Sequence, residues 1–273
     1  PDLQLKLEDN LFIRQAVPRR GVVCSNQERA RRLAAEYLVD STTFSCSWGA
    51  QVWVGHYKDA PEQFSKQELF VALAPVGSGS GLVFQELFSA GCEYLVRYGS
   101  DDVKSPDPED YHAVKMVDVT DNLVGFAAAS GLPESEWGKP VPASPVMVQA
   151  FEQEAADRKI AVQKRICHHL ENYHSLRNPQ TYPQRSHVLQ AQLSKLKEVT
   201  PDGRKESFDM ESAVLFRVAK DSGRHAISIL QTVNKEAPSD CDPYEGENRQ
   251  QALEKEKQLF VDYIFCSLLR LDT

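Results

Sequence analysis

The sequence predicts an α/β fold with one central mixed β-sheet that is flanked by helices on both faces. Two segments carry this prediction. Residues 20–38, RGVVCSNQERARRLAAEYL, have the pattern of a short strand, a polar turn and an amphipathic helix. Residues 69–100, LFVALAPVGSGSGLVFQELFSAGCEYLVRYGS, have that of a buried strand, a Gly/Ser loop, a helix that ends at Gly91, and a second strand. Strand–helix–strand order is typical of a parallel or mixed sheet covered by helices.

The remaining elements follow from the same periodicities. In the first helix the apolar residues share one face: Ala30, Leu33, Ala34, Tyr37 and Leu38. Further strands are predicted at 50–57, 111–121, 161–174 and 225–234. Further helices are predicted at 147–160, from Met210 to near Gly223, and at 246–271. We find no flexible linker, so residues 1–273 are predicted to form one domain.

The charge and the hydropathy pattern exclude several kinds of partner. The chain has 31 Lys and Arg against 39 Asp and Glu, a formal net charge of −8, which repels polyanions. No apolar run approaches the roughly 20 residues that span a bilayer, and residues 1–10 lack the basic and apolar regions of a signal peptide. We therefore expect a cytoplasmic protein that binds neither nucleic acid nor membrane.

Metal and thiol chemistry have weak support in the sequence. The cysteines are scattered without a CxxC pair, so neither a zinc site nor a disulfide framework is indicated. Cys167, His168 and His169 are adjacent, but adjacent side chains point in different directions on a strand or a helix. Asp101 and Asp102 could bind a divalent cation or belong to a solvated loop. Metal binding is therefore left open.

Two features indicate an anion site. The loop VGSGSG, residues 76–81, lies between a strand and a helix, where backbone N–H groups and the helix dipole attract an anion; the alternative is a tight turn. Arg97 lies near the end of an apolar strand and is costly to bury unless it meets an anion. With Ser100 and Gly99 beside it, a phosphate site is predicted; the alternative is an internal salt bridge to Asp101 or Asp102.

Four segments, VVCSNQERARRLA, APVGSGSGLVFQELFSAG, YLVRYGS and FDMESAVLFRVAKDSG, together resemble the nucleoside phosphorylases of the uridine and bacterial purine type. The resemblance spans roughly residues 20–235, and its most specific element is Met210-Glu211-Ser212. It implies a phosphate site formed by four residues: Arg29, Gly77, Arg97 and Ser100. It also implies that Met210 packs on ribose and that Glu211 accepts hydrogen bonds from the ribose hydroxyl groups. Arg97 and Glu211 are then the catalytic residues. Asp209 is predicted instead to cap the following helix or to balance charge.

The base site is less closely matched. Asn234 and Lys235 stand where purine-type members have an aspartate, which resembles the pyrimidine branch. TYPQRS, residues 181–186, approximates the family's uracil loop, so Gln184 and Arg185 are the base-binding candidates, with Gln180 and Arg177 behind them. The alternative is a solvated polar loop.

The resemblance implies a uridine phosphorylase, a pentosyltransferase of nucleoside salvage that uses inorganic phosphate as co-substrate and no cofactor. Deoxyuridine and thymidine are further candidate substrates. The family completes its site across a subunit interface, so at least a homodimer is expected. Residues 47–56 offer no arginine for that purpose, which leaves His56 as the candidate, and Ser25-Asn26 replaces the usual Gly-Asp. The alternatives are a purine nucleoside phosphorylase and a catalytically impaired, nucleoside-binding or structural relative.

Overall fold

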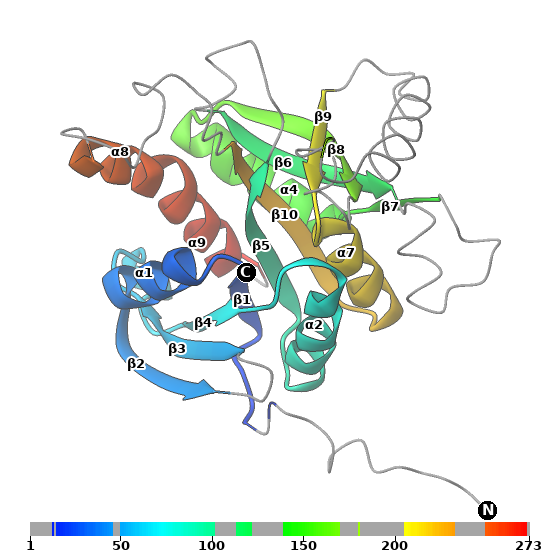
Figure 1. The fold of residues 1–273 in the computed structure, drawn as a ribbon. Coiled ribbons are helices and arrows are strands. Elements are labelled where there is room, and N and C mark those ends of the chain that lie inside the picture. The colour runs from blue at the N-terminus through cyan, green and yellow to red at the C-terminus, as the bar shows by residue number, and fades with distance from the viewer. Residues whose placement is uncertain are drawn as a thin grey trace, which may run out of the picture.

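A computed structural model describes residues 13, 15–45, 50–101, 113–121, 139–169, 180, 205–232 and 249–271. Its strands form one ten-stranded sheet in the order β2-β3-β4-β1-β5-β10-β6-β8-β9, with β7 paired to β6 (Figure 1). The strands are β1 Arg20–Cys24, β2 Leu38–Ser45, β3 Gln51–Tyr57, β4 Glu68–Leu73, β5 Tyr94–Asp101, β6 Val114–Asp121, β7 Pro140–Pro142, β8 Val162–His169, β9 Glu206–Asp209 and β10 His225–Thr232.

The helices that pack on this sheet are α1 Gln27–Tyr37, α2 Ser80–Ser89, α4 Pro145–Arg158, α7 Ser212–Asp221, α8 Arg249–Glu256 and α9 Asp262–Leu269. A π-helical segment, Lys257–Val261, joins α8 to α9, and short 3₁₀ turns lie at Glu62–Phe64 and Gly77–Gly79. The predicted α/β class with a mixed sheet is confirmed. No helix in the described ranges is long and apolar enough to cross a membrane.

The sheet is parallel from β4 to β10 and again from β6 to β9, and it is antiparallel at the β2–β3–β4 edge and between β10 and β6. β1 pairs in parallel with both β4 and β5, and β5 pairs in parallel with β10. β10 then pairs antiparallel with β6, as do β2 with β3 and β3 with β4. Parallel strands place their carboxyl ends at one edge, which is where open α/β sheets bind ligands.

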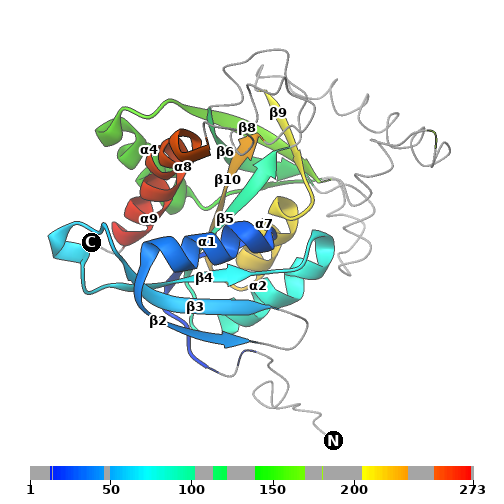
Figure 2. The same cartoon turned by 60° about the vertical axis from the view of Figure 1, so that its left-hand side comes forward.

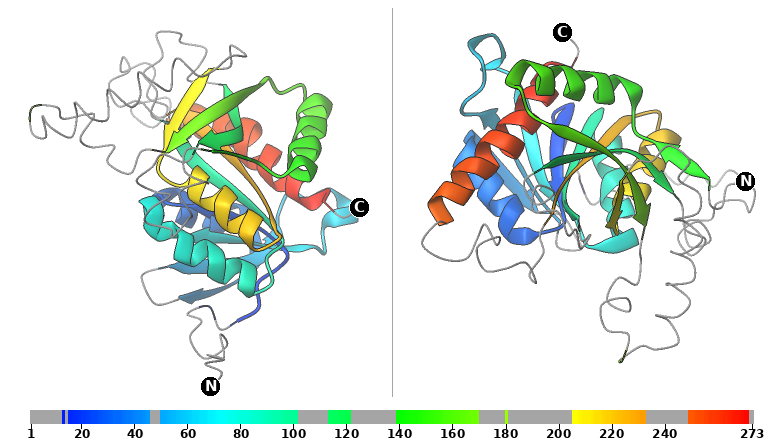
Figure 3. Two further views of the ribbon diagram at one scale, coloured as in Figure 1. Left: turned by 90° about the vertical axis from the view of Figure 1, so that its right-hand side faces the viewer. Right: turned by 90° about the horizontal axis from the view of Figure 1, so that it is seen from above.

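The two faces of β5 are covered by different helices. α2 and α7 lie side by side on one face (Figure 3), and a Cβ at Gly81 would lie 2.9 Å from Cγ1 of Val214, so glycine allows this close approach. α1 and the closing helices α8 and α9 cover the other face (Figure 2). Successive side chains of β5 therefore point toward different helices.

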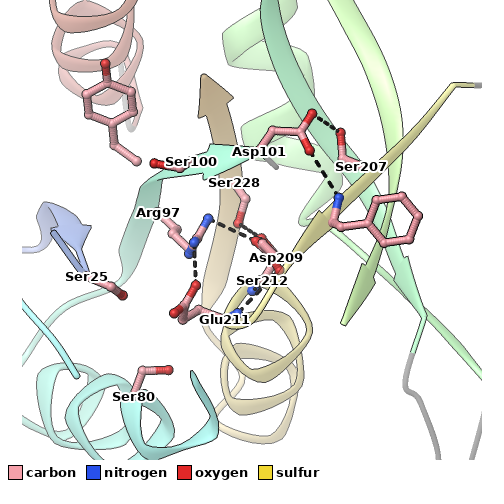
Figure 4. A network of polar contacts seen from close by, with 12 residues as sticks. Ser25, Ser80, Arg97, Ser100, Asp101, Ser207, Asp209, Glu211, Ser212 and Ser228 are labelled. Carbon is pink, nitrogen blue, oxygen red and sulfur yellow. Dashed lines mark hydrogen bonds and ion pairs between the residues drawn. The ribbon is translucent and has the colours of Figure 1, made fainter. Parts of the chain in front are cut away.

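The half of the sheet beyond β5 coils so that its last strand, β9, returns to β5. The N–H of Phe208 on β9 donates to Oδ1 of Asp101 on β5 at 3.1 Å, and the Ser207 hydroxyl donates to Oδ2 at 2.9 Å (Figure 4). Lys115 on β6 is fully buried and donates to the same carboxylate at 2.7 Å. A buried carboxylate with this many donors is well compensated, and it fixes β9 against β5.

Several predicted boundaries differ from the structure. Strands β2 and β9 were not predicted, since β2 is largely exposed and β9 is only four residues long. The predicted helix start at Met210 is wrong, because α7 begins at Ser212 and the preceding residues end β9 and turn. Leu38 begins β2 and does not extend α1. The closing helix contains the π segment that periodicity did not reveal.

Candidate active site

A pocket of about 250 Å³ lies at the carboxyl ends of β1 and β5, beside the turn from β9 into α7. Its lining residues come from separate parts of the chain: Ser25, Asn26, Arg29, Val76, Arg97, Gly99, Ser100, Phe208, Asp209, Met210 and Glu211. The structure thus brings five of the predicted phosphate and ribose residues into one pocket: Arg29, Arg97, Ser100, Met210 and Glu211.

Arg97 is buried and points to the α7 side of β5, where it meets two carboxylates (Figure 4). Its Nη2 donates to Glu211, and its Nη1 lies 2.9 Å from Oδ2 of Asp209. Burial by itself would lower the pKa of Arg97, but Asp209 and Glu211 raise it above its usual value. The predicted alternative, a salt bridge to Asp101, is wrong, because Asp101 pairs with Lys115.

Gly99 makes this position of the Arg97 side chain accessible. A Cβ at Gly99 would lie 1.8 Å from Nη1 of Arg97 and 2.2 Å from Cζ. Residues two apart on a strand share a face, so any larger residue would compete with the guanidinium for the same space. Because Gly99 has no side chain, the Arg97 side chain can lie along its own strand, over Gly99.

Asp209 caps the helix that follows it and balances the charge of Arg97, as predicted. Its Oδ1 accepts from the N–H groups of Glu211 at 3.3 Å and Ser212 at 3.1 Å, and the Ser212 hydroxyl donates to Oδ2. These are N–H groups at the start of α7 that have no partner within the helix. Asp209 is thereby held in place and, in turn, orients Glu211 beside it.

Glu211 also contacts the Gly/Ser loop. The N–H of Gly77 donates to Oε1 of Glu211 at 2.8 Å, and Gly77 has φ 78°, which favours glycine. The Ser80 hydroxyl donates to the carbonyl of Gly77 at 2.7 Å and tightens the 3₁₀ turn before α2. One carboxylate therefore joins the loop after β4, the strand β5 and the turn after β9.

Arg29 enters the pocket from the other face of β5. Its backbone N–H donates at 2.9 Å to the side chain of Asn26, the N-cap of α1. Its guanidinium lies over the Tyr98 ring, 4.5 Å from the centroid, and donates to the Ser100 hydroxyl at 3.3 Å and to the Tyr98 carbonyl at 3.5 Å. Within the described ranges no carboxylate lies within ion-pair distance of this buried guanidinium. A buried cation with only neutral partners favours an anionic ligand.

Other predicted residues do not join this pocket or lie outside the described residues. Gln184, Arg185, Arg177, Asn234, Lys235 and Asp102 are outside the described residues. Gln180 is exposed, and His56 lies on β3 without lining the pocket. Burial raises the pKa of the Cys167 thiol well above its usual value, so a thiolate nucleophile is not indicated there. In the described part of the chain, no three His, Cys, Asp or Glu side chains are grouped to hold a metal ion.

Sequence reasoning missed three functional features. Phe208 lines the pocket, although it was assigned no role, and Gly99 is required by the Arg97 side chain. Lys115 was seen only as part of a strand, yet it is buried with Asp101. A lysine within an apolar strand run is itself a signal, because a fully buried ammonium needs a carboxylate partner.

Structure comparison relates this fold to solved enzymes. The uridine phosphorylase of Vibrio fischeri ES114, solved with 6-hydroxy-1-naphthoic acid, has a TM-score of 0.63 and 17% identity, covering 93% of this chain and 89% of that one. The purine nucleoside phosphorylase of Toxoplasma gondii, solved with immucillin-H, has a TM-score of 0.67 and 16% identity, covering 94% of each chain. No family model and no curated protein sequence matches the chain. The chain therefore has the fold of nucleoside phosphorylases.

Proposed function

We propose that the chain is a nucleoside phosphorylase, a pentosyltransferase that cleaves a nucleoside with inorganic phosphate to give a free base and a pentose 1-phosphate. The carrying observation is the arrangement of the pocket. Arg29, with no carboxylate partner among the described residues, lies beside the Ser100 hydroxyl at one side, while the Glu211 carboxylate and Met210 line the other. An anion and a sugar with hydroxyl groups are the ligands that these two sides fit.

The proposed chemistry follows from charge development at the sugar. A phosphate oxygen attacks C1′ as the bond from C1′ to the base nitrogen breaks, and the electron pair of that bond leaves with the base. Positive charge develops on the ribose, and a phosphate held next to C1′ stabilises it. The phosphate is held by Arg29, Ser100 and Arg97, together with the loop that begins at Gly77. Glu211 accepts hydrogen bonds from the ribose hydroxyls, and Met210 packs on the sugar.

Uridine is the first proposed substrate, with deoxyuridine and thymidine next. Support comes from Asn234 and Lys235, which resemble the pyrimidine branch, and from Gln184 and Arg185 as candidates to bind uracil carbonyls and N3–H. These residues lie outside the described part of the chain. We further propose that the protein acts in nucleoside salvage in the cytoplasm, forms at least a homodimer and needs no cofactor.

The test is base release from uridine, thymidine and inosine in parallel, with and without phosphate. We expect uracil to be released only when phosphate is present. Hypoxanthine release would replace uridine by a purine nucleoside as substrate. No release from any of the three by folded protein would favour the catalytically impaired alternative.

Glu211→Ala tests the site itself. We expect turnover to fall by about 1,000-fold or more, since hydrogen bonds that strengthen in the transition state are lost. Asp221→Ala, at the exposed end of the same helix α7, is the matched control and should keep normal turnover. Circular dichroism and the melting temperature establish that both variants fold. Equal turnover in the two variants would contradict the assignment of Glu211.

A further inference from the structure

A cluster of polar residues, all buried except the half-buried Arg32, lies behind the pocket, on the face of β5 opposite Glu211. Its members come from α1, β5, β10 and the closing helix: Arg29, Arg32, Tyr98, Gln231 and Glu256. Of these only Arg29 has a part in the proposed chemistry. The other four are polar groups in the interior whose arrangement needs a reason, because buried polar groups cost free energy unless they are well compensated.

Tyr98 is at the centre of this cluster, where Arg29 and Phe260 contact its ring and two further side chains contact its hydroxyl. The Arg29 guanidinium lies over one face, and the Phe260 ring stacks nearby with centroids 5.7 Å apart. The hydroxyl lies 2.7 Å from Oε1 of Glu256 and 2.8 Å from Oε1 of Gln231. These contacts fix both the position and the plane of the ring under Arg29.

Glu256 gives Arg29 and Arg32, both on α1, different electrostatic surroundings. Its Oε1 accepts from Nη2 of Arg32 at 2.9 Å, and its Oε2 lies 2.8 Å from Nη1 of the same guanidinium. Arg32 is therefore paired with a carboxylate on two atoms, whereas Arg29, one helical turn earlier, rests on an aromatic ring and neutral oxygens. This leaves the charge of Arg29 available to the pocket.

The closing helix carries two partners of Tyr98, one just before an irregularity and one within it. Glu256 is the last residue of α8, and Phe260 belongs to the π segment Lys257–Val261 that follows. A π segment interrupts the regular hydrogen-bond ladder and often occurs at functional sites. Glu256 and Phe260 are four residues apart, so they lie on one face of the helix and both contact Tyr98.

We propose that Tyr98 is a positioning residue for phosphate: its ring, anchored by Glu256 and Phe260, aims the Arg29 guanidinium at the anion. The inference rests on the proposed function and deepens it, since it assigns control of phosphate affinity to the closing helix. Tyr98 does not line the pocket and acts only through Arg29. Its loss should therefore affect phosphate and leave the nucleoside side of the site unchanged.

The experiment compares Tyr98→Leu, Tyr98→Phe and Tyr263→Phe. Tyr263 is the matched control, because it is a fully buried tyrosine of α9 whose hydroxyl donates to the Phe151 carbonyl at 3.1 Å, away from the pocket lining. In Tyr98→Leu, which removes the ring, we expect the phosphate Kd and KM to rise by about 10-fold. In Tyr98→Phe, which keeps the ring and loses its anchor, a rise of about 3-fold is expected. The nucleoside KM and kcat should stay unchanged in both.

Phosphate Kd is measured by calorimetry without nucleoside, so the inference can be tested separately from turnover. The wild-type chain could bind phosphate but release no base, while the phosphate Kd is raised in Tyr98→Leu. That outcome supports the inference and contradicts the proposed function. Active enzyme in which Tyr98→Leu matches Tyr263→Phe in phosphate Kd and KM overturns the inference. Equal rises of the phosphate and nucleoside KM values also overturn it, because that pattern indicates general loosening of the fold. Absence of phosphate binding by the wild type overturns both.

Discussion

The two arginines of the pocket have opposite surroundings, although both are buried and both reach the end of β5. Arg97 lies between the carboxylates of Asp209 and Glu211 on the α7 side. Arg29 lies over the Tyr98 ring on the α1 side and meets a hydroxyl and a carbonyl. The first charge is balanced by the protein, and the second has only neutral partners among the described residues.

Arg97 therefore also holds the site together through its ion pairs, whereas the charge of Arg29 is available to a ligand alone. Removing one member of a buried ion pair leaves the other uncompensated, which is costly. Removing a buried cation that no carboxylate faces leaves no such residual charge. The comparison therefore predicts that replacing Arg97 mainly lowers the stability of the fold, whereas replacing Arg29 mainly weakens phosphate binding.

The largest expected effect is on the stability of Arg97→Met. It leaves Asp209 and Glu211 buried without their cation, so we expect the free energy of unfolding to fall by about 3–5 kcal/mol. Arg29→Met should lower it by about 1 kcal/mol or less while weakening phosphate binding strongly. Denaturant unfolding and calorimetry measure the two quantities. Equal destabilisation by the two variants would contradict the comparison.

The next largest effect is expected for Gly99→Ala, which tests whether the Arg97 side chain needs the space above Gly99. The added Cβ would lie 1.8 Å from Nη1 of Arg97, so the guanidinium must move off its carboxylates, and we expect a loss of about 1–3 kcal/mol in stability. Turnover should fall as well. Gly79→Ala is the control, since its Cβ would meet only Cβ of Pro75, at 3.9 Å. The explanation fails if the two alanine variants unfold at the same denaturant concentration.

A smaller effect is expected for Ser100→Ala on the Arg29 side. Its hydroxyl accepts from Nη2 of Arg29 at 3.3 Å and lines the pocket. Its removal should raise the phosphate KM by about 3- to 10-fold with little change in stability. Ser89→Ala removes an exposed hydroxyl that donates to the Gln85 carbonyl, and it should leave the phosphate KM unaltered. An unchanged phosphate KM in Ser100→Ala would place the anion elsewhere.

The smallest expected effect is a pH dependence on the same side. Burial would raise the pKa of Glu256, but hydrogen bonding and charge from Arg32, with Tyr98, lower it below the usual 4.5. The folded state thus binds this proton less readily than the unfolded state, so Glu256 adds stability above pH 4.5 that is lost as the pH falls through the lowered folded-state value. The stability difference between wild type and Glu256→Gln should shrink in acid. A difference that is constant with pH would show that Glu256 does not titrate in this way.

The local elements of the fold were predictable where one periodicity dominates. β1 with α1, and β4 through β5, were confirmed because apolar spacing and glycines mark their limits within a few residues. β2 and β9 escaped prediction for a physical reason: a mostly exposed edge strand and a four-residue strand do not show an apolar period. The start of α7 depends on the Asp209 cap, which only hydrogen bonds identify.

The sequence by itself determined which residues could hold an anion and a sugar, because Arg29, Arg97, Ser100, Met210 and Glu211 follow from strand ends, a Gly/Ser loop and a family resemblance. Tertiary structure decided how they pair. Arg97 meets Glu211, 114 residues away, and not the neighbouring Asp101, because the coiled sheet brings β9 and the turn after it to the end of β5. Arg29 has no carboxylate partner among the described residues, because Glu256 of the closing helix forms its ion pair with Arg32. Such choices depend on contacts distant in sequence, which local spacing does not encode.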